Sequence, residues 1–81
     1  MAKILTLEEA MEADIFWFES RGTYSSEYGR VCDEHHNSIA IERLGFTGFA
    51  FEDSQFYGSW WRCWDSKPTD EQRKSEPWKE D

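Results

Sequence analysis

Four large apolar residues stand in a row at residues 15–18, as Ile-Phe-Trp-Phe, and no other segment constrains the fold as strongly. A short run of aromatic and β-branched residues is typical of a strand that is buried on both faces. Polar residues bound the run, with Asp14 on one side and Arg21-Gly22 on the other. The sequence therefore predicts a central strand here, which other elements must cover.

Further short segments carry strand-like patterns at intervals of about ten residues, with turn-forming residues between them. They are residues 28–33, 39–43, 46–52 and 60–65. A chain of 81 residues is too short to bury two cores, so we expect one domain that spans residues 1–81.

Both ends of the chain predict a short helix that opens with a capping box. Thr6 pairs with Glu9 in the first box, and Thr69 pairs with Gln72 in the second. A helix of two turns cannot stand alone, so the face of the first helix that carries Leu7 and Met11 must dock on something apolar. The predicted fold class is α+β: a small antiparallel meander of four or five strands, barrel-like or packed on the helices, with a short helix at each end.

The composition is acidic, with 17 Asp and Glu residues against nine Lys and Arg residues and a formal net charge of −8. Nucleic acid and anionic membranes repel such a chain, so we expect neither as a direct partner. A basic protein surface is the natural partner, although the charge could serve only to keep a Trp-rich domain soluble. The sequence has no apolar run of ~18 residues and does not begin like a signal peptide, so we expect a soluble intracellular protein.

A dense acidic stretch near the front of the chain is the main candidate for partner binding. Such carboxylates can engage Arg and Lys side chains that otherwise grip phosphates, and the alternative is the solvated face of an ordinary helix. Five Trp residues are also more than a small core needs, and an exposed Trp is a common interface anchor. The candidate partner-binding residues are Glu8, Glu9, Glu12, Asp14, Glu19, Glu52, Asp53 and Trp60.

Cys32, His35, His36 and Cys63 are four candidate zinc ligands, because zinc takes four N or S ligands in a tetrahedron. Cys63 lacks the neighbouring ligand of a zinc ribbon, so a loop His pair beside core thiols is the favoured alternative. No nucleophile elbow, phosphate-binding loop or metalloprotease helix is present. We therefore expect no enzyme, no cofactor and no bound metal.

The segment Trp-Arg-Cys-Trp-Asp-Ser-Lys-Pro-Thr-Asp-Glu-Gln-Arg at residues 61–73, followed by Pro77-Trp78, resembles the C-terminus of small proteins from phages and mobile elements of gut and related bacteria. Those proteins begin with a Leu-Thr-Leu-Glu-Glu helix, as residues 5–9 do here. The resemblance covers about a third of the chain and supplies no catalytic residues. It implies a mobile-element context, in which small acidic inhibitors of bacterial defence, such as anti-CRISPR proteins, are frequent.

These observations lead to a phage-type inhibitor, in the host cytoplasm, that binds a bacterial defence protein of the CRISPR-Cas kind and blocks its basic nucleic-acid-binding surface. Two alternatives remain from the sequence. One is a structural or regulatory mobile-element module, such as a homodimer joined through an exposed strand edge. The other is a small zinc-binding domain.

Overall fold

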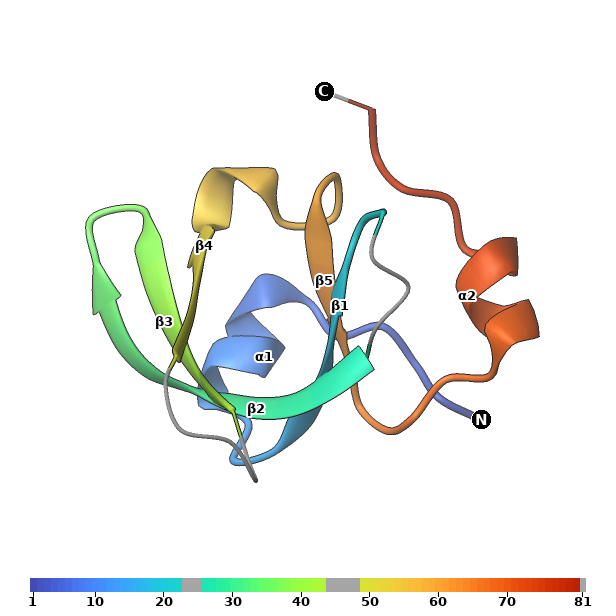
Figure 1. Cartoon of the computed structure of the whole chain (residues 1–81), viewed down its shortest axis with the longest axis horizontal. Coiled ribbons are helices and arrows are strands. Elements are labelled where there is room, and N and C mark those ends of the chain that lie inside the picture. The colour runs from blue at the N-terminus through green and yellow to red at the C-terminus, as the bar shows by residue number, and fades with distance from the viewer. Residues whose placement is uncertain (23–25, 44–48, 81) are drawn as a thin grey trace.

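The computed structural model describes residues 1–22, 26–43 and 49–80, which form an antiparallel sheet with two short helices. The helices are α1 (Leu7–Glu12) and α2 (Asp70–Ser75), and a short 3-10 helix, η1 (Ser54–Phe56), follows the fourth strand. The strands are β1 (Phe16–Ser20), β2 (Ser26–His35), β3 (Ser38–Arg43), β4 (Phe49–Asp53) and β5 (Trp61–Trp64). The predicted α+β class is confirmed (Figure 1).

The strand order is β4-β3-β2-β1-β5, so the first four strands form the predicted meander and β5 returns to pair with β1. The N-terminal segment extends the sheet beyond β5, where Leu5 N–H donates to the Cys63 carbonyl and Asp65 N–H donates to the Lys3 carbonyl. In the described part of the chain β4 stays at the opposite edge, so the sheet does not close into the barrel that the sequence allowed.

β1 contains most of the apolar run that predicted a central strand. It has a strand on each side, although β2 occupies the middle position of the sheet. Phe16 and Phe18 are buried, whereas Ile15 precedes the strand and is exposed. The run is therefore a strand, one residue later than expected and with its first residue outside the core.

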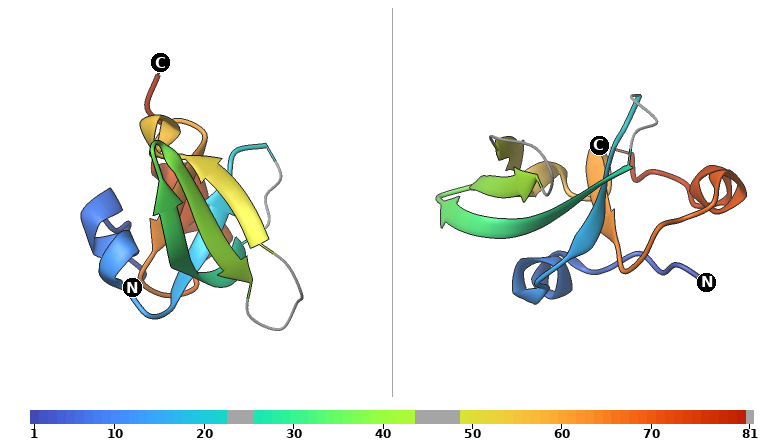
Figure 2. Two further views of the ribbon diagram at one scale, coloured as in Figure 1. Left: turned by 90° about the vertical axis from the view of Figure 1, so that its left-hand side faces the viewer. Right: turned by 60° about the horizontal axis from the view of Figure 1, so that its bottom comes forward.

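The two faces of the sheet have different coverings, as the alternation of side chains along each strand requires. Ala10 of α1 packs on one face, where it joins a core with Phe16, Phe18, Ile41 and Trp61. The opposite face of β1 and β5 is covered by the C-terminal segment that contains α2. Figure 2 shows that α1 and α2 lie against different parts of the sheet.

The turn between β2 and β3 is tighter than the sequence predicted. β2 continues to His35, and only His36 and Asn37 form the turn, with His36 at a φ of 56°. The strand predicted here ended at Asp33, whereas Glu34 and His35 are also paired in the sheet. A register shift between Val31 and Asp33 bends the long strand. Residues 23–25, within the turn predicted between the first two strands, and the start of the strand predicted at residues 46–52 lie outside the described residues.

Gly29 of β2 lies where its neighbours leave no room for a side chain. A Cβ atom built there would lie 2.7 Å from Ile41 Cγ2 and 2.8 Å from the Glu42 carbonyl oxygen. Both distances are shorter than van der Waals contact allows, so only glycine fits this position. This close approach lets β1, β2 and β3 pack tightly on the core face, where Gly29 is directly opposite Phe16.

Both predicted capping boxes are confirmed. Glu9 N–H donates to Thr6 Oγ1 while Thr6 N–H donates to Glu9 Oε1, and Thr69 and Gln72 make the same reciprocal pair. Each box satisfies two groups that the start of a helix leaves unpaired, which is why helices this short form here. Neither described helix has the length or the apolar character needed to span a lipid bilayer.

Candidate functional site

Helix α1 presents three of the predicted partner-binding residues to solvent. Glu8, Glu9 and Glu12 are exposed, while Ala10 is buried and holds the opposite side of the helix against the core. Asp14 is also exposed, directly after the helix. We call these four residues, Glu8, Glu9, Glu12 and Asp14, the α1 acidic surface.

Among the described residues, no ion pair within 4.0 Å involves Glu8, Glu12 or Asp14 of the α1 acidic surface. Glu9 accepts hydrogen bonds from Thr6, and these lower the pKa of its carboxyl group. The negative charge of this surface is therefore available to an external cation.

Glu19 does not belong to this surface, and its predicted role in partner binding is wrong. Its side chain is 5% exposed and lies on the other face of the sheet from α1. Glu19 Oε1 accepts hydrogen bonds from Arg62 Nε at 2.7 Å and from Trp64 Nε1 at 2.8 Å. Glu19 Oε2 accepts a third hydrogen bond from Arg73 Nε at 3.2 Å. This carboxylate is a structural ion inside the protein.

The electrostatics of Glu19 reflect two opposing effects. Burial raises the pKa of the Glu19 carboxyl group, but hydrogen bonds from Arg62, Trp64 and Arg73 outweigh burial and hold the pKa below its usual value. This pairing could not be predicted from the sequence, because strand alternation shows only that Glu19 and Arg62 alternate with apolar neighbours. Their direct pairing across β1 and β5 depends on the register.

Arg62 joins the sheet to the C-terminal segment. Its Nη1 and Nη2 atoms donate to the carbonyl oxygens of Glu76 and Arg73 at the end of α2. Its guanidinium carbon also lies 4.0 Å from the ring centre of Trp78 and 5.2 Å from that of Trp64. Such stacking suits the flat guanidinium group. The contacts of Arg62 thus help to fix where α2 and Trp78 lie.

Glu52 and Asp53, at the end of β4, lie apart from the α1 acidic surface in the sequence and have different surroundings. Asp53 Oδ1 accepts from Gln55 N–H at 2.8 Å and so caps η1. Glu52 is partly buried, and desolvation raises the pKa of its carboxyl group. Hydrogen bonds and ion pairs among the described side chains do not involve Glu52.

Trp60 is 50% exposed, as expected of an anchor, but it lies at the far end of β1 from Asp14. Trp60 is next to Arg21, whose guanidinium carbon is 5.4 Å from the Trp60 ring centre. The five residues of β1 span about 16 Å, at roughly 3.3 Å per residue. Trp60 and the α1 acidic surface are therefore separate features.

The remaining tryptophans are mostly structural. Trp61 and Trp64 are each 1% exposed. Trp17 and Trp78 are partly buried, and Lys67 Nζ lies 5.7 Å from the Trp17 ring centre. The sequence-based expectation that some Trp residues are exposed holds clearly for Trp60.

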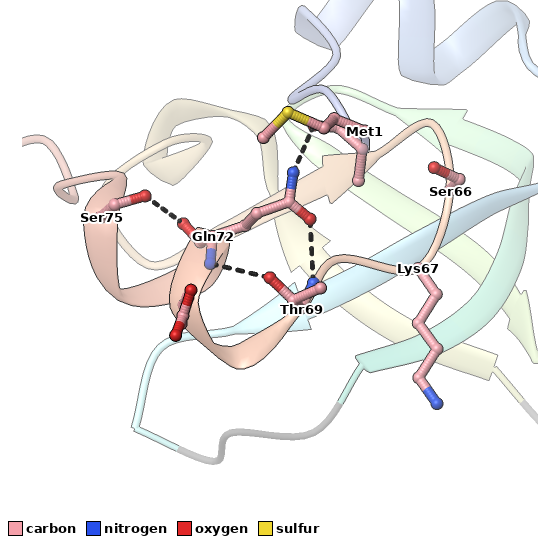
Figure 3. A pocket seen from close by; sticks show the side chains of 8 residues that line it. Met1, Ser66, Lys67, Thr69, Gln72 and Ser75 are labelled. Carbon is pink, nitrogen blue, oxygen red and sulfur yellow. Dashed lines mark hydrogen bonds between the residues drawn. The ribbon is translucent and has the colours of Figure 1, made fainter.

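Two cavities flank α2. The first, shown in Figure 3, has a volume of about 550 Å³ and lies between the N-terminus and the helix, where Gln72 Nε2 donates to the Ala2 carbonyl. The second, of about 630 Å³, is lined by Lys74, Pro77 and Trp78 and reaches Glu19. Its buried carboxylate is already bound by three donors, so this cavity offers a ligand little unpaired polarity.

The four candidate zinc ligands do not form a described cluster. Cys63 has a free, fully buried thiol, and burial raises its pKa far above the usual range. His35 and His36 are exposed at the β2–β3 turn. Among the side chains that the structure describes, no three His, Cys, Asp or Glu residues gather as a metal site would require. The side chain of Cys32 lies outside that description.

Two exposed phenylalanines on β4 are the surface feature that the sequence analysis missed. Phe49 is 53% exposed and Phe51 is 67% exposed, with their ring centres 6.4 Å apart. The alternation of Phe49, Ala50 and Phe51 placed both rings on one face of a strand. This alternation does not show that the strand lies at the edge of the sheet, or that both rings on this face are exposed to solvent.

No family model, curated protein or solved structure matches this chain.

Proposed function

We propose that this chain is a binding protein without catalytic activity, and that its α1 acidic surface engages a basic, nucleic-acid-binding surface of a bacterial defence protein. In this proposal it acts in the host cytoplasm as a phage-type inhibitor. The observation that carries the proposal is the exposed group of carboxylates at Glu8, Glu12 and Asp14, which form no ion pair with other described residues.

These charges are placed where they destabilise α1, which supports a role in binding and not in helix stability. Glu8 and Glu12 are one turn apart, and like charges at that spacing destabilise a helix by about 0.2–0.5 kcal/mol. Glu12 also lies in the last turn of α1, which has no basic residue, where the helix dipole disfavours a negative charge. A cationic partner would relieve both effects.

The identity of the partner class comes from charge and from the resemblance of the two ends of the chain to phage and mobile-element proteins. A surface that binds nucleic acid is rich in Arg and Lys, which carboxylates can engage in place of phosphates. Because such an interaction acts between exposed charges, it weakens as salt rises.

A matched pair of variants tests the proposal. The first replaces Glu8 and Glu12 with Gln and Asp14 with Asn, and leaves the capping residue Glu9 unchanged. The control removes the same number of charges near the C-terminus by replacing Glu71, Glu76 and Glu80, all exposed, with Gln. Both variants have the same net charge, so a difference between them reports the location of the charges.

The assay is phage plating on bacteria that carry an active CRISPR-type defence and express each protein. We expect the wild type and the C-terminal control to restore plating of a targeted phage, and the α1 variant to restore it far less. Equal plating with and without the wild-type protein would refute the inhibitor role. Equal activity of both variants would refute the role of α1.

A further inference from the structure

β4 is an edge strand with an unusual combination of features. It pairs with β3 on one side, and the described residues place no strand on its other side. Edge strands of natural proteins are commonly protected by Lys or Pro, but β4 reads Phe-Ala-Phe-Glu-Asp and has neither. The outward backbone groups of β4 and its side chains together indicate what this strand could bind.

The hydrogen-bond pattern fixes which backbone groups of β4 point away from the sheet. Ser54 N–H donates to the Asn37 carbonyl, and antiparallel ladders alternate between bonded and non-bonded pairs. Glu52 opposite Ile39 and Ala50 opposite Ile41 are therefore the bonded pairs. The N–H and C=O groups of Phe49 and Phe51 then point outward, from the same two residues whose rings are exposed.

The other face of β4 carries a charge. Glu52 and Ala50 lie on the face opposite to the phenylalanines, and Ala50 belongs to the core. Glu52 is partly buried and, among the described side chains, has no ion pair or hydrogen bond. A desolvated carboxylate without a counterion favours a cation beside it.

We propose that β4 binds an extended segment of another protein by strand addition, and that this segment alternates apolar residues with Lys or Arg. Main-chain hydrogen bonds to the outward groups of Phe49 and Phe51 would supply affinity. The apolar residues of the segment lie opposite Phe49 and Phe51, and a basic residue lies opposite Glu52.

Charge complementarity favours this occupant over a second copy of the chain. The strand ends in two acidic residues, and the net charge of −8 repels another copy as it attracts a basic segment. This inference uses a surface other than the α1 acidic surface, so either proposal can fail while the other holds.

The probe is a short synthetic peptide in which lysine alternates with valine, added to the full chain labelled with ¹⁵N. We expect the largest amide shifts at Phe49 and Phe51. Two control peptides test the chemistry: one has glutamate in place of lysine, and one has N-methylated valines that cannot donate to β4. We expect both controls to bind far more weakly.

Variants separate the backbone from the side chain. Phe51→Pro removes the outward N–H but leaves the pairs with β3, because proline is tolerated where its nitrogen faces away from the sheet. Phe51→Val removes the ring and keeps the N–H, so we expect it to bind the peptide more tightly than Phe51→Pro. Glu52→Gln should weaken binding about fivefold, as expected for a partly exposed ion pair.

Several outcomes would overturn the proposal. Shifts that map to α1 instead of β4, or equal binding of the N-methylated peptide, would exclude strand addition. Equal binding of the glutamate peptide would exclude the basic partner. Analytical ultracentrifugation of the free chain gives the last test: a monomer is expected, and a dimer that Phe51→Pro dissociates would make a second copy the occupant.

Discussion

Replacing Glu19 with Gln tests whether the buried carboxylate holds the C-terminal segment on the sheet. The change keeps the shape of the side chain and removes its charge. Arg62, whose side chain is 2% exposed, would then keep a buried positive charge without its counterion. Breaking a buried pair in this way costs about 3–5 kcal/mol, which is a large part of the roughly 5–15 kcal/mol that stabilises a domain.

The chain offers a matched control at its surface. Arg30 Nε and Glu42 Oε2 are also 2.7 Å apart, but their side chains are 55% and 37% exposed. An exposed pair contributes about 0–1 kcal/mol because water solvates both partners when the pair breaks. Glu42→Gln therefore makes the same chemical change with a small expected effect.

The measurement is urea unfolding of the wild type and both variants at pH 7, followed by Trp fluorescence. We expect Glu19→Gln to lose at least about 2 kcal/mol more than Glu42→Gln. The thermal midpoint of Glu19→Gln should fall by at least about 12 °C, at about 4 °C or more per kcal/mol for a domain of this size. Equal losses in the two variants would refute the idea that burial gives this carboxylate its importance.

Three further predictions concern the same fold. The pKa of Glu19 is lowered in the folded state, so its stabilising effect is complete above the unfolded-state pKa of about 4.3 and is lost as pH falls through the folded-state pKa. Below pH ~4, the free energy of unfolding of the wild type should therefore fall more steeply with decreasing pH than that of Glu19→Gln. Gly29→Ala should destabilise the protein by about 1–3 kcal/mol, since its methyl group meets Ile41 and a backbone carbonyl, and a thermal midpoint equal to the wild type would contradict this close approach. Thr69→Ala should cost about 1 kcal/mol through the lost cap, whereas Thr69→Ser should cost little; denaturant curves that show the same loss for both would contradict a capping role.

Local sequence patterns predicted most of the elements because each depends on near neighbours. The capping boxes at Thr6 and Thr69 depend on residues three positions apart, and both form. Alternation placed Phe49 and Phe51 on one face of a strand. The order of the strands depends on contacts between distant segments, so neither the return of β5 to β1 nor the edge position of β4 could be inferred.

The candidate site divides for the same reason. Glu8, Glu9 and Glu12 could be placed on one helix because their spacing is local, and the structure has them exposed. Glu19 belongs to the same acidic stretch in the sequence, but β1 carries it to the other face of the sheet, opposite Arg62. Glu19 was therefore grouped with the carboxylates of α1 because it is near them in the sequence, although the sheet places its side chain on the other face.

The proposal that the α1 acidic surface binds a basic partner is tested most directly by the salt dependence of that binding. The partner is first isolated from bacterial lysate on immobilised wild-type protein, and its affinity is then measured by calorimetry from low to high salt. We expect the wild type and the Glu71/Glu76/Glu80 control to lose affinity steeply as salt rises, and the Glu8/Glu12/Asp14 variant to bind weakly with a flatter dependence. An affinity that does not change with salt, or an α1 variant that binds like the wild type, would contradict the account.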